Sequence, residues 1–423
     1  MPHLLLTPIL LLAPLPGMGA TQLPPPGEWV SRSYGYHLSA RADGYVVYDV
    51  LGDACTRRRD PTPLFDEFAP EGTQRLRARV AHEPYDYRFE RVSAPCRIDG
   101  SRDPERNLAA MRQFFAQHYA FDAERGIQPP SADDRGMDAF DESTVRAFIA
   151  RYRDAHVSFS GMLDGEEVEL DADPGLVDVL TSRIGAPFLK TYWSRHVAED
   201  ILGGKGRFAA QRRIQYGVID GDIGYLGLVS MGGYAPQETH DDLAVLDAVL
   251  AQMADQFKTA GVRGVIVDLS ANSGGYDHLA RRLAGQFTDH PVDLYCKQVR
   301  KPPGDRQCMR SDPARSALHV PVAVLTSRLT VSAAEIAVLS LRAQGAVHLG
   351  EPTRGALSDA LVKYLPGGAT ITLSNEVYTD VDGHAWEATG IAPDQPAPNL
   401  DTADPLGSHA ALVRAAAERL RDP

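Results

Sequence analysis

Apolar residues recur with two different spacings in the first half of the chain, and each spacing predicts a different structure. Over residues 27–100, apolar and polar positions alternate in short stretches separated by Gly, Pro and Asp, which predicts a small β-rich domain. Residues 103–205 instead place apolar side chains at helical spacing, and the stretch 143–156 repeats this pattern. The clearest helical series is Leu108, Met111, Phe114 and Phe115. We therefore expect a helical region after the β-rich domain.

The second half, residues 206–423, alternates continuous apolar strands with amphipathic helices. The expected strands are 222–231, 261–270, 321–327 and 346–352, and the expected helices are 241–260, 278–287 and 332–344. Residues 369–380 resemble one arm of a hairpin. Strands that are apolar throughout are typical of a sheet covered on both faces, so this half predicts an α/β core.

The N-terminus has the pattern of a secretory signal peptide over residues 1–20. An apolar run, Leu4–Leu12, is followed by small residues at 17–20. No Lys or Arg precedes the run, so a wrongly assigned start codon or a short membrane anchor are alternatives. No other apolar segment approaches the ~20 residues of a membrane-spanning helix. The pattern predicts a periplasmic or secreted protein.

The four cysteines agree with export. Cys55 and Cys96 form one separated pair, and Cys296 and Cys308 another. An even number in an exported chain predicts disulfides, and pairing within each pair is the simplest of three connectivities. The alternative is four buried thiols in a cytoplasmic protein. The sequence has no CxxC and no His cluster with zinc spacing, so we expect neither a metal nor another cofactor.

The net charge of the chain excludes nucleic acids as partners. The net charge is −13, and no basic patch is present, whereas binding to nucleic-acid phosphates requires one. The 43% hydrophobic and 23% charged residues are ordinary for a globular protein, so composition narrows the function no further.

Two turns contain residues that could take part in nucleophilic catalysis or anion binding. Ser332 stands between an apolar strand and a helix that begins Ala-Ala-Glu, where a hydroxyl can act as a nucleophile or simply cap the helix. Gly274 and Gly275 follow a buried strand, and their N–H groups can form an anion-binding nest or only a tight connection. GxGxxG and Walker motifs are absent from this turn.

Four motifs together resemble the S41 peptidases, the group of tail-specific proteases and the tricorn core. DLSANSGG (268–275) resembles the family's D-L-R-x-N-x-G-G element, and residues 330–355 resemble its nucleophile helix and G-E-x-T-x-G turn. HAWEATGIAPDQP (384–396) resembles the closing segment, and RYRDAHVSFSG (151–161) resembles the D-x-H element of the tricorn-like branch. The resemblance covers residues 103–396.

The resemblance implies a ClpP/crotonase-like β-spiral core and a serine endopeptidase acting on polypeptides. Ser332 would be the nucleophile, His156 the general base and Glu387 the group that supports the base. The oxyanion hole would use the N–H of Gly274 or Gly275 together with that of Ala333. A serine needs a base to remove its proton, and the base needs a third group to fix its tautomer, so these residue types suit the chemistry.

The resemblance also separates two branches of the family. The tail-specific branch uses a lysine just beyond G-E-x-T-x-G, but here the first lysine after Ser332 is Lys363, too late for that motif. A PDZ insert has no room between His156 and Tyr216. Ser–His–Glu chemistry is therefore favoured. The sequence departs from the tricorn pattern at Ala155, where that branch has a serine, and at Ser270, where the family has an arginine.

Each assignment has a structural alternative. Ser332 can be only a helix cap, His156 a structural histidine and Glu387 a surface acid. Asn272 is expected to be a turn-former that bonds its own loop. The alternative function is a non-catalytic protein on the same fold that binds apolar ligands, as the family's retinoid-binding relatives do, or polypeptides. The sequence leaves the oligomeric state and the cleavage preference open.

Overall fold

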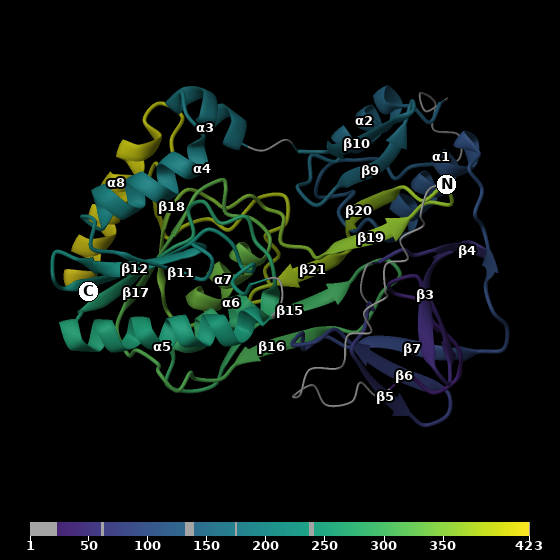
Figure 1. Cartoon of the computed structure of the whole chain (residues 1–423), viewed down its shortest axis with the longest axis horizontal. Coiled ribbons are helices and arrows are strands. Elements are labelled where there is room, and N and C mark those ends of the chain that lie inside the picture. Colours follow the sequence, from purple (N-terminus) through teal and green to yellow (C-terminus); the bar gives the residue numbers. More distant parts are fainter. Residues whose placement is uncertain (1–22, 61–62, 132–138, 174–175, 237–240, 423) are drawn as a thin grey trace, which may run out of the picture.

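The computed structural model describes residues 23–60, 63–131, 139–173, 176–236 and 241–422. The predicted signal peptide, residues 1–20, lies outside them. The described strands form four sheets, and Figure 1 shows them in two halves, with the seven-stranded sheet in one half and the N-terminal strands in the other.

The seven-stranded sheet is the centre of the C-terminal half. Its strands, in spatial order, are β11 (Arg207–Ala209), β12 (Ile214–Ile219), β13 (Ile223–Leu228), β14 (Gly264–Asp268), β17 (Val322–Thr326), β18 (Val347–Gly350) and β22 (Gln395–Pro396). The strands from β13 to β22 are parallel, and β11 and β12 are antiparallel additions at one edge.

Helices cover both faces of this sheet. They are α5 (Asp242–Ala260), α6 (Asp277–Ala284), α7 (Ala333–Arg342) and the short η2 (Gly285–Phe287) on one face, and α3 (Val177–Ile184), α4 (Phe188–Thr191), the π-helix η1 (Tyr192–Ile201) and α8 (Pro405–Arg421) on the other. In β14, Val265 and Val267 join the first core, whereas Ile266 joins the second. Because successive side chains in a strand point to opposite faces, a strand buried on both faces is apolar throughout. The predicted α/β core is confirmed.

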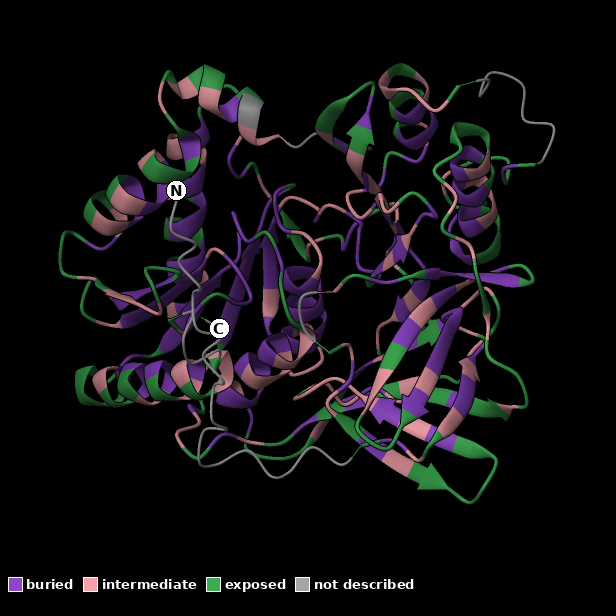
Figure 2. Ribbon diagram, turned by 45° about the vertical axis from the view of Figure 1, so that its right-hand side comes forward, coloured by how far each residue is buried: buried purple, intermediate pink, exposed green. Residues whose placement is uncertain are grey.

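The N-terminal half has an eight-stranded sheet and its own core. In spatial order the strands are β5 (Glu67–Glu71), β6 (Arg75–Arg79), β7 (Tyr87–Val92), β1 (Gly27–Ser31), β2 (Tyr36–Arg41), β3 (Gly44–Leu51), β4 (Ala54–Arg57) and β8 (Arg97–Ile98). Its core also takes side chains from α1 (Pro104–His118) and α2 (Glu142–Ala150). The β-rich segment and the first helices therefore share one hydrophobic core, and Figure 2 shows buried residues on the strands as well as on the helices.

The segment 103–205 is not helical throughout. It contains the hairpin β9 (Ser158–Leu163) and β10 (Glu166–Asp171), which joins β20 (Thr370–Ser374) and β19 (Ala360–Tyr364) in a four-stranded sheet. Asp164 and Gly165, between the hairpin strands, have φ values of 52° and 87°. An Asp-Gly pair with positive φ at both positions is the usual two-residue hairpin turn, so this signal was present in the sequence.

The predicted hairpin arm 369–380 is also divided between two sheets. Its first part is β20, whereas its second part, β21 (Glu376–Thr379), pairs with β15 (Val292–Val299). The third strand of this small sheet is β16 (Gln307–Ser311). The segment therefore links the two halves of the molecule. Its strand β20 pairs with β9 of the β9–β10 hairpin, whereas Tyr378 of β21 belongs to the core of the C-terminal half.

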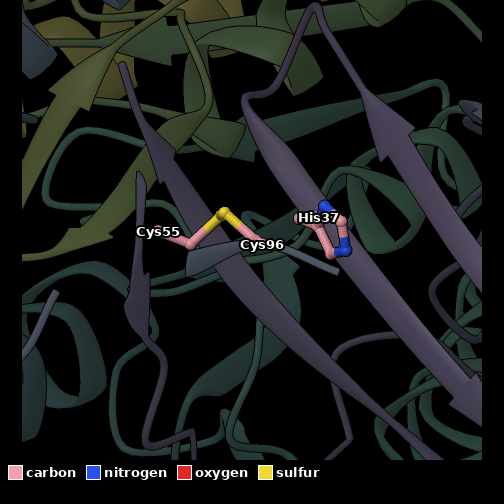
Figure 3. A group of neighbouring side chains, drawn as sticks. All are labelled: His37, Cys55 and Cys96. Atoms are coloured by element: carbon pink, nitrogen blue, oxygen red, sulfur yellow. A yellow bond between two sulfur atoms is a disulfide. The ribbon is translucent and has the colours of Figure 1, made fainter. Parts of the chain in front are cut away.

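Both predicted disulfides are present, Cys55–Cys96 and Cys296–Cys308. His37 lies beside the first of them (Figure 3). The two sulfurs are bonded to each other rather than being thiolates, and the His37 Nε2 atom is 2.9 Å from a Glu28 carboxylate oxygen. This group is therefore a poor metal site, because cysteine binds metals as the thiolate. Among the helices that the structure describes, none combines the length and apolarity needed to cross a bilayer.

Candidate active site

Ser332 occupies the turn between β17 and α7 in an unusual backbone conformation. Its φ is 61° and its ψ is −132°, and its side chain is partly exposed. A non-glycine residue held in such a region costs roughly 1–3 kcal/mol and is characteristic of functional turns. In acyl-transfer folds, a strained turn between a strand and a helix can expose a serine hydroxyl. The local backbone therefore supports more than a simple helix cap at this position.

A buried carboxylate holds the Ser332 turn in place. Glu335, in the first turn of α7, accepts hydrogen bonds from the N–H groups of Ser332, Gly355 and Ala356 at 3.1, 2.8 and 3.0 Å. The Thr353 hydroxyl donates a fourth. Burial raises the pKa of Glu335 to about 7, while these hydrogen bonds act to lower it. The Ser332 N–H also donates to the Ala356 carbonyl at 3.1 Å, which ties the turn to residues 355–358.

The loop that carries Gly274 and Gly275 lies directly against Ser332. A Cβ atom at Gly274 would be 2.6 Å from the Ser332 Cβ, and one at Gly275 would be 2.0 Å from the Met231 carbonyl oxygen. Both positions therefore require glycine because no side chain fits. As expected, Asn272 bonds its own loop, since its Oδ1 accepts from the Gly274 N–H at 2.9 Å.

This bond distinguishes the candidate oxyanion donors. The Gly274 N–H is already used by Asn272. Within the described part of the chain, the N–H groups of Gly275 and Ala333 have no acceptor. Free N–H groups at a glycine turn and at a helix start are the donors that a developing oxyanion needs. Gly275 and Ala333 are thus the better-placed pair.

His156 lies in the loop that connects α2 to β9. Its N–H donates to the Asp154 carboxylate at 2.9 Å, and its carbonyl accepts from the Thr372 hydroxyl at 2.7 Å. The Nδ1 atom is buried and has no hydrogen-bond partner among the described residues. Burial is the main cause that lowers the pKa of His156, against the opposing charges of Asp154 and Asp359. The ring is therefore neutral at pH 7, as a general base must be.

Glu387 is buried and bonded on both carboxylate oxygens. It accepts from the N–H groups of Leu357 and Ser358 at 2.8 and 3.0 Å, and an Arg125 guanidinium nitrogen lies 3.0 Å from its other oxygen. Burial raises the pKa of Glu387, and the charge of Asp154 raises it further, whereas Arg125 lowers it. This residue is therefore not an ordinary surface acid.

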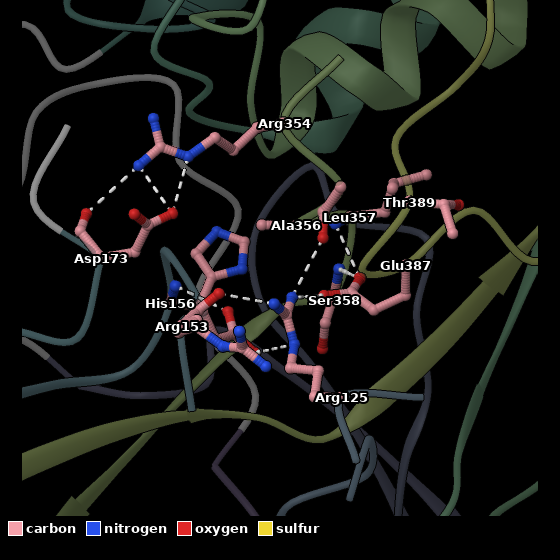
Figure 4. A network of polar contacts seen from close by, with 12 residues as sticks. Arg125, Arg153, His156, Asp173, Arg354, Ala356, Leu357, Ser358, Glu387 and Thr389 are labelled. Atoms are coloured by element: carbon pink, nitrogen blue, oxygen red, sulfur yellow. Dashed lines mark hydrogen bonds and ion pairs between the residues drawn. The ribbon is translucent and has the colours of Figure 1, made fainter. Parts of the chain in front are cut away.

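Arg125 connects Glu387 with the His156 loop (Figure 4). Its Nε atom is 3.5 Å from Asp154, and it donates to the carbonyls of Arg153 and Gly355 at 2.6 and 3.0 Å. The bonds that the Glu387 carboxylate makes to described residues reach Arg125, Leu357 and Ser358, but not the His156 ring. Arg125 had no signal in the sequence, because it lies in an ordinary polar turn far from both partners along the chain.

One cavity of about 530 Å³ brings the three sequence motifs together. Ala155, Ser273 and Val331 all line it. Each of these residues immediately precedes a candidate site residue, namely His156, Gly274 and Ser332. The histidine loop, the glycine loop and the serine turn thus face the same space, although they are far apart in sequence.

The buried lysines lie elsewhere. Lys363 Nζ bonds Asp49 at 3.0 Å and the carbonyls of Tyr34 and Gly35, all in the N-terminal half. Lys297 Nζ bonds Glu376 at 2.8 Å. Of the lysines in the described ranges, these are the two that are buried, and both are already paired with carboxylates. A serine–lysine pair at Ser332 therefore has no support in this geometry.

Known proteins resemble the part of the chain that holds these loops. Residues 222–397 match the model of peptidase family S41. The carboxy-terminal processing protease CtpA of Bacillus subtilis (strain 168) is 28% identical over 175 residues, which are 41% of this chain and 34% of that protein. The match thus spans about a third of the length of this curated relative.

A solved structure matches a larger share of the fold. A putative peptidase from Parabacteroides merdae ATCC 43184 is 18% identical with a TM-score of 0.55, and the match covers 75% of this chain and 97% of that one. At this identity the likeness concerns the fold. The part of this chain that matches the model of peptidase family S41, residues 222–397, thus includes the serine turn, the glycine loop and Glu387.

Proposed function

We propose that this protein is a serine endopeptidase that cleaves polypeptides through an acyl-enzyme, with Ser332 as nucleophile and His156 as general base. The observation that carries the proposal is the shared cavity, lined by the residues that precede His156, Gly274 and Ser332. The strained conformation of Ser332 and the lowered pKa of the His156 imidazole agree with these roles.

The reaction follows from the properties of these groups. His156 removes the proton as the Ser332 oxygen attacks the peptide carbonyl, and the carbonyl electrons move to its oxygen. The N–H groups of Gly275 and Ala333 stabilise that oxyanion, and one such donor contributes on the order of 3 kcal/mol. When the intermediate collapses, the C–N bond breaks and His156 returns the proton to the leaving amine. Water then attacks the acyl-enzyme in the same manner and regenerates Ser332.

Glu387 supports His156 indirectly in this proposal. Arg125 lies between Glu387 and Asp154, and Asp154 fixes the backbone of His156. Arg125 places a positive charge between two buried carboxylates and lowers the pKa of Glu387 against the opposing effect of burial. Glu387 and Arg125 are thus positioning residues, and this route replaces the serine that the tricorn-like branch has at the position of Ala155.

The proposal also covers the branch of the peptidase family and the cellular compartment of the protein. The paired lysines and the His156 loop favour the tricorn-like Ser–His–Glu mechanism over a serine–lysine mechanism. Two disulfides favour an oxidising compartment, so we place the protein in the periplasm or outside the cell.

The test is cleavage of an unfolded protein and of a mixed fluorogenic peptide library by wild type and by Ser332→Ala. We expect Ser332→Ala to lose at least about 10³-fold of kcat/KM, since removing a serine nucleophile leaves only the binding and oxyanion contributions. Ser93→Ala, which changes an exposed serine in the N-terminal half, is the matched control and should cleave like wild type. Equal activity of Ser332→Ala would overturn the proposal.

The apolar lining of the cavity favours a second function, binding of an apolar ligand or polypeptide without catalysis. Folded wild type that neither cleaves the library nor reacts with a fluorophosphonate would support this second function.

A further inference from the structure

The far wall of the cavity beside Ser332 is built by a segment that lies outside the matched family region. Val177 of α3, Leu189 of α4 and Trp193 of η1 line it. The near wall comes from the core loops and includes Val229, Ala271, Leu329 and Val331. Figure 1 shows α3 and α4 beside α8, on the same side of the molecule as the seven-stranded sheet. Residues 176–202 therefore complete a space that the family segment, residues 222–397, leaves open.

Two side chains of this wall present apolar surface to the cavity. Leu189 is 46% exposed, although large apolar side chains are usually buried. Trp193 is mostly buried, and its indole N–H donates to the Arg212 carbonyl at 2.6 Å, so its polar atom is already satisfied. The rest of the ring is then an apolar surface, which suits contact with another apolar group.

Charge in the cavity has one sign. The charged residues that line it are Arg212, Arg213 and Arg354, and its lining, all from described residues, includes no carboxylate. Arg354 is paired with Asp173 at 2.7 Å, and the Arg212 guanidinium lies 3.6 Å from the centre of the Phe208 ring. A lysine or arginine side chain entering the cavity would lose its water without gaining a partner. The cavity therefore favours large apolar side chains and rejects cationic ones.

We propose that this cavity is the subsite for a large apolar side chain next to the scissile bond, and that residues 176–202 set this preference. This inference rests on the proposed peptidase function, because the subsite takes its meaning from Ser332. Ala155 and Val331 line the cavity and adjoin the candidate base and nucleophile, so a side chain bound there belongs to a residue beside the bond that is cut.

The test uses peptides that differ at one position, which carries Leu, Phe, Ala or Lys. We expect wild type to cleave the Leu and Phe peptides at least about 10-fold better in kcat/KM than the Ala peptide, since one additional methylene in an apolar pocket already contributes about that factor. The Lys peptide should be the poorest substrate. Cleavage of all four at equal rates would overturn the inference while leaving the peptidase proposal intact.

Leu189→Asp tests the wall itself, because an exposed position tolerates an acid without unfolding the protein. It should lose about tenfold in kcat/KM for the Leu peptide and gain activity on the Lys peptide. The matched control is Met162→Asp on β9, where Met162 is 59% exposed and does not line the cavity. Identical preferences in the two variants would contradict the inference.

A binding measurement separates this inference from the proposed function. If wild type cleaves no peptide, binding of a labelled Leu peptide is measured by fluorescence anisotropy. The proteins compared are Ser332→Ala alone, Ser332→Ala with Leu189→Asp, and Ser332→Ala with Met162→Asp. Binding that Leu189→Asp weakens at least tenfold and Met162→Asp leaves unchanged supports the subsite even without catalysis. Equal binding by both double variants overturns it.

Discussion

The serine turn and the histidine loop are built in different ways. The turn at Ser332 is held by neighbours from the family segment, chiefly the Glu335 carboxylate and the backbone of residues 353–356. The loop at His156 lies in the N-terminal half and is fixed by a chain of buried charges, Asp154, Arg125 and Glu387. The first arrangement is mostly local hydrogen bonding, and the second requires ion pairs between segments 262 residues apart.

The two arrangements differ in which substitutions would disrupt them. A buried carboxylate that accepts several N–H bonds keeps its geometry as long as the backbone folds. An ion-pair chain fails when any charged member is removed, because its partners stay buried without compensation. We therefore expect the nucleophile side to tolerate distant changes and the base side to depend on Arg125.

Replacing the base should have the largest effect. We expect His156→Gln to reduce kcat/KM at least about 10³-fold, because a general base contributes 10²–10⁴-fold and the serine would keep its proton. Thermal unfolding should change little, since the His156 side chain has an unpartnered Nδ1 among the described residues. His384→Gln, at an exposed histidine three residues before Glu387, is the control. Loss of activity in both variants would point to a general disturbance instead.

Removing the cation between the two carboxylates tests the ion-pair chain. Arg125→Met should lower the free energy of unfolding by about 3–5 kcal/mol, because Glu387 and Asp154 are left buried and unpaired. Urea unfolding measures this loss. The control is Arg153→Met, at the exposed arginine that precedes Asp154, which should lower the free energy of unfolding much less.

The double variant Arg125→Met/Glu387→Gln tests whether these two residues are energetically coupled. It should recover part of the stability, because one of the two orphaned charges is gone. Additive losses in the double variant would mean that Arg125 and Glu387 are not coupled.

The close approach of the glycine loop to Ser332 can be tested with matched glycines. Gly274 and Gly221 have φ values of 82° and 86°, but only Gly274 faces other atoms, whereas nothing lies within 4 Å of a Cβ at Gly221. Both alanine variants should lose stability from backbone strain, and Gly274→Ala should lose more because its methyl group also meets Ser332 and the Val331 carbonyl. Gly274→Ala should also lose about 10- to 100-fold of kcat/KM, since its methyl group would displace Ser332. Equal activity in the two variants would contradict the placement of this loop.

The dependence on pH is the smallest expected effect. Burial lowers the pKa of His156 below 6.5, so protonation of this base should not reduce kcat/KM between pH 8 and about 6.5. That reduction should come only at lower pH, where the ring takes up a proton. The unfolded chain binds this proton at higher pH than the folded chain does, so stability should also fall below about pH 6.5. A titration midpoint of the His156 ring above pH 7, followed by NMR, would contradict the lowered pKa of this imidazole.

The sequence predicts those parts of the structure that depend on short-range patterns. The strand-turn-helix at Ser332, the Gly274–Gly275 loop and both disulfide pairings follow from local motifs and spacing. Arg125 was not predictable in this way, because its partners are distant in sequence and a single arginine in a polar turn has no pattern. The β9–β10 hairpin was missed although its Asp-Gly turn was visible. The wall formed by residues 176–202 depends on how these helices pack, which spacing alone does not specify.

The most direct test of the account is to map the site of fluorophosphonate labelling by mass spectrometry and to compare the labelling rates of wild type and His156→Gln. We predict a single adduct on Ser332, formed at least about 10³-fold faster in wild type, because His156 activates that hydroxyl. An adduct on any other residue, or equal rates on Ser332 in both proteins, would contradict the pairing of Ser332 with His156.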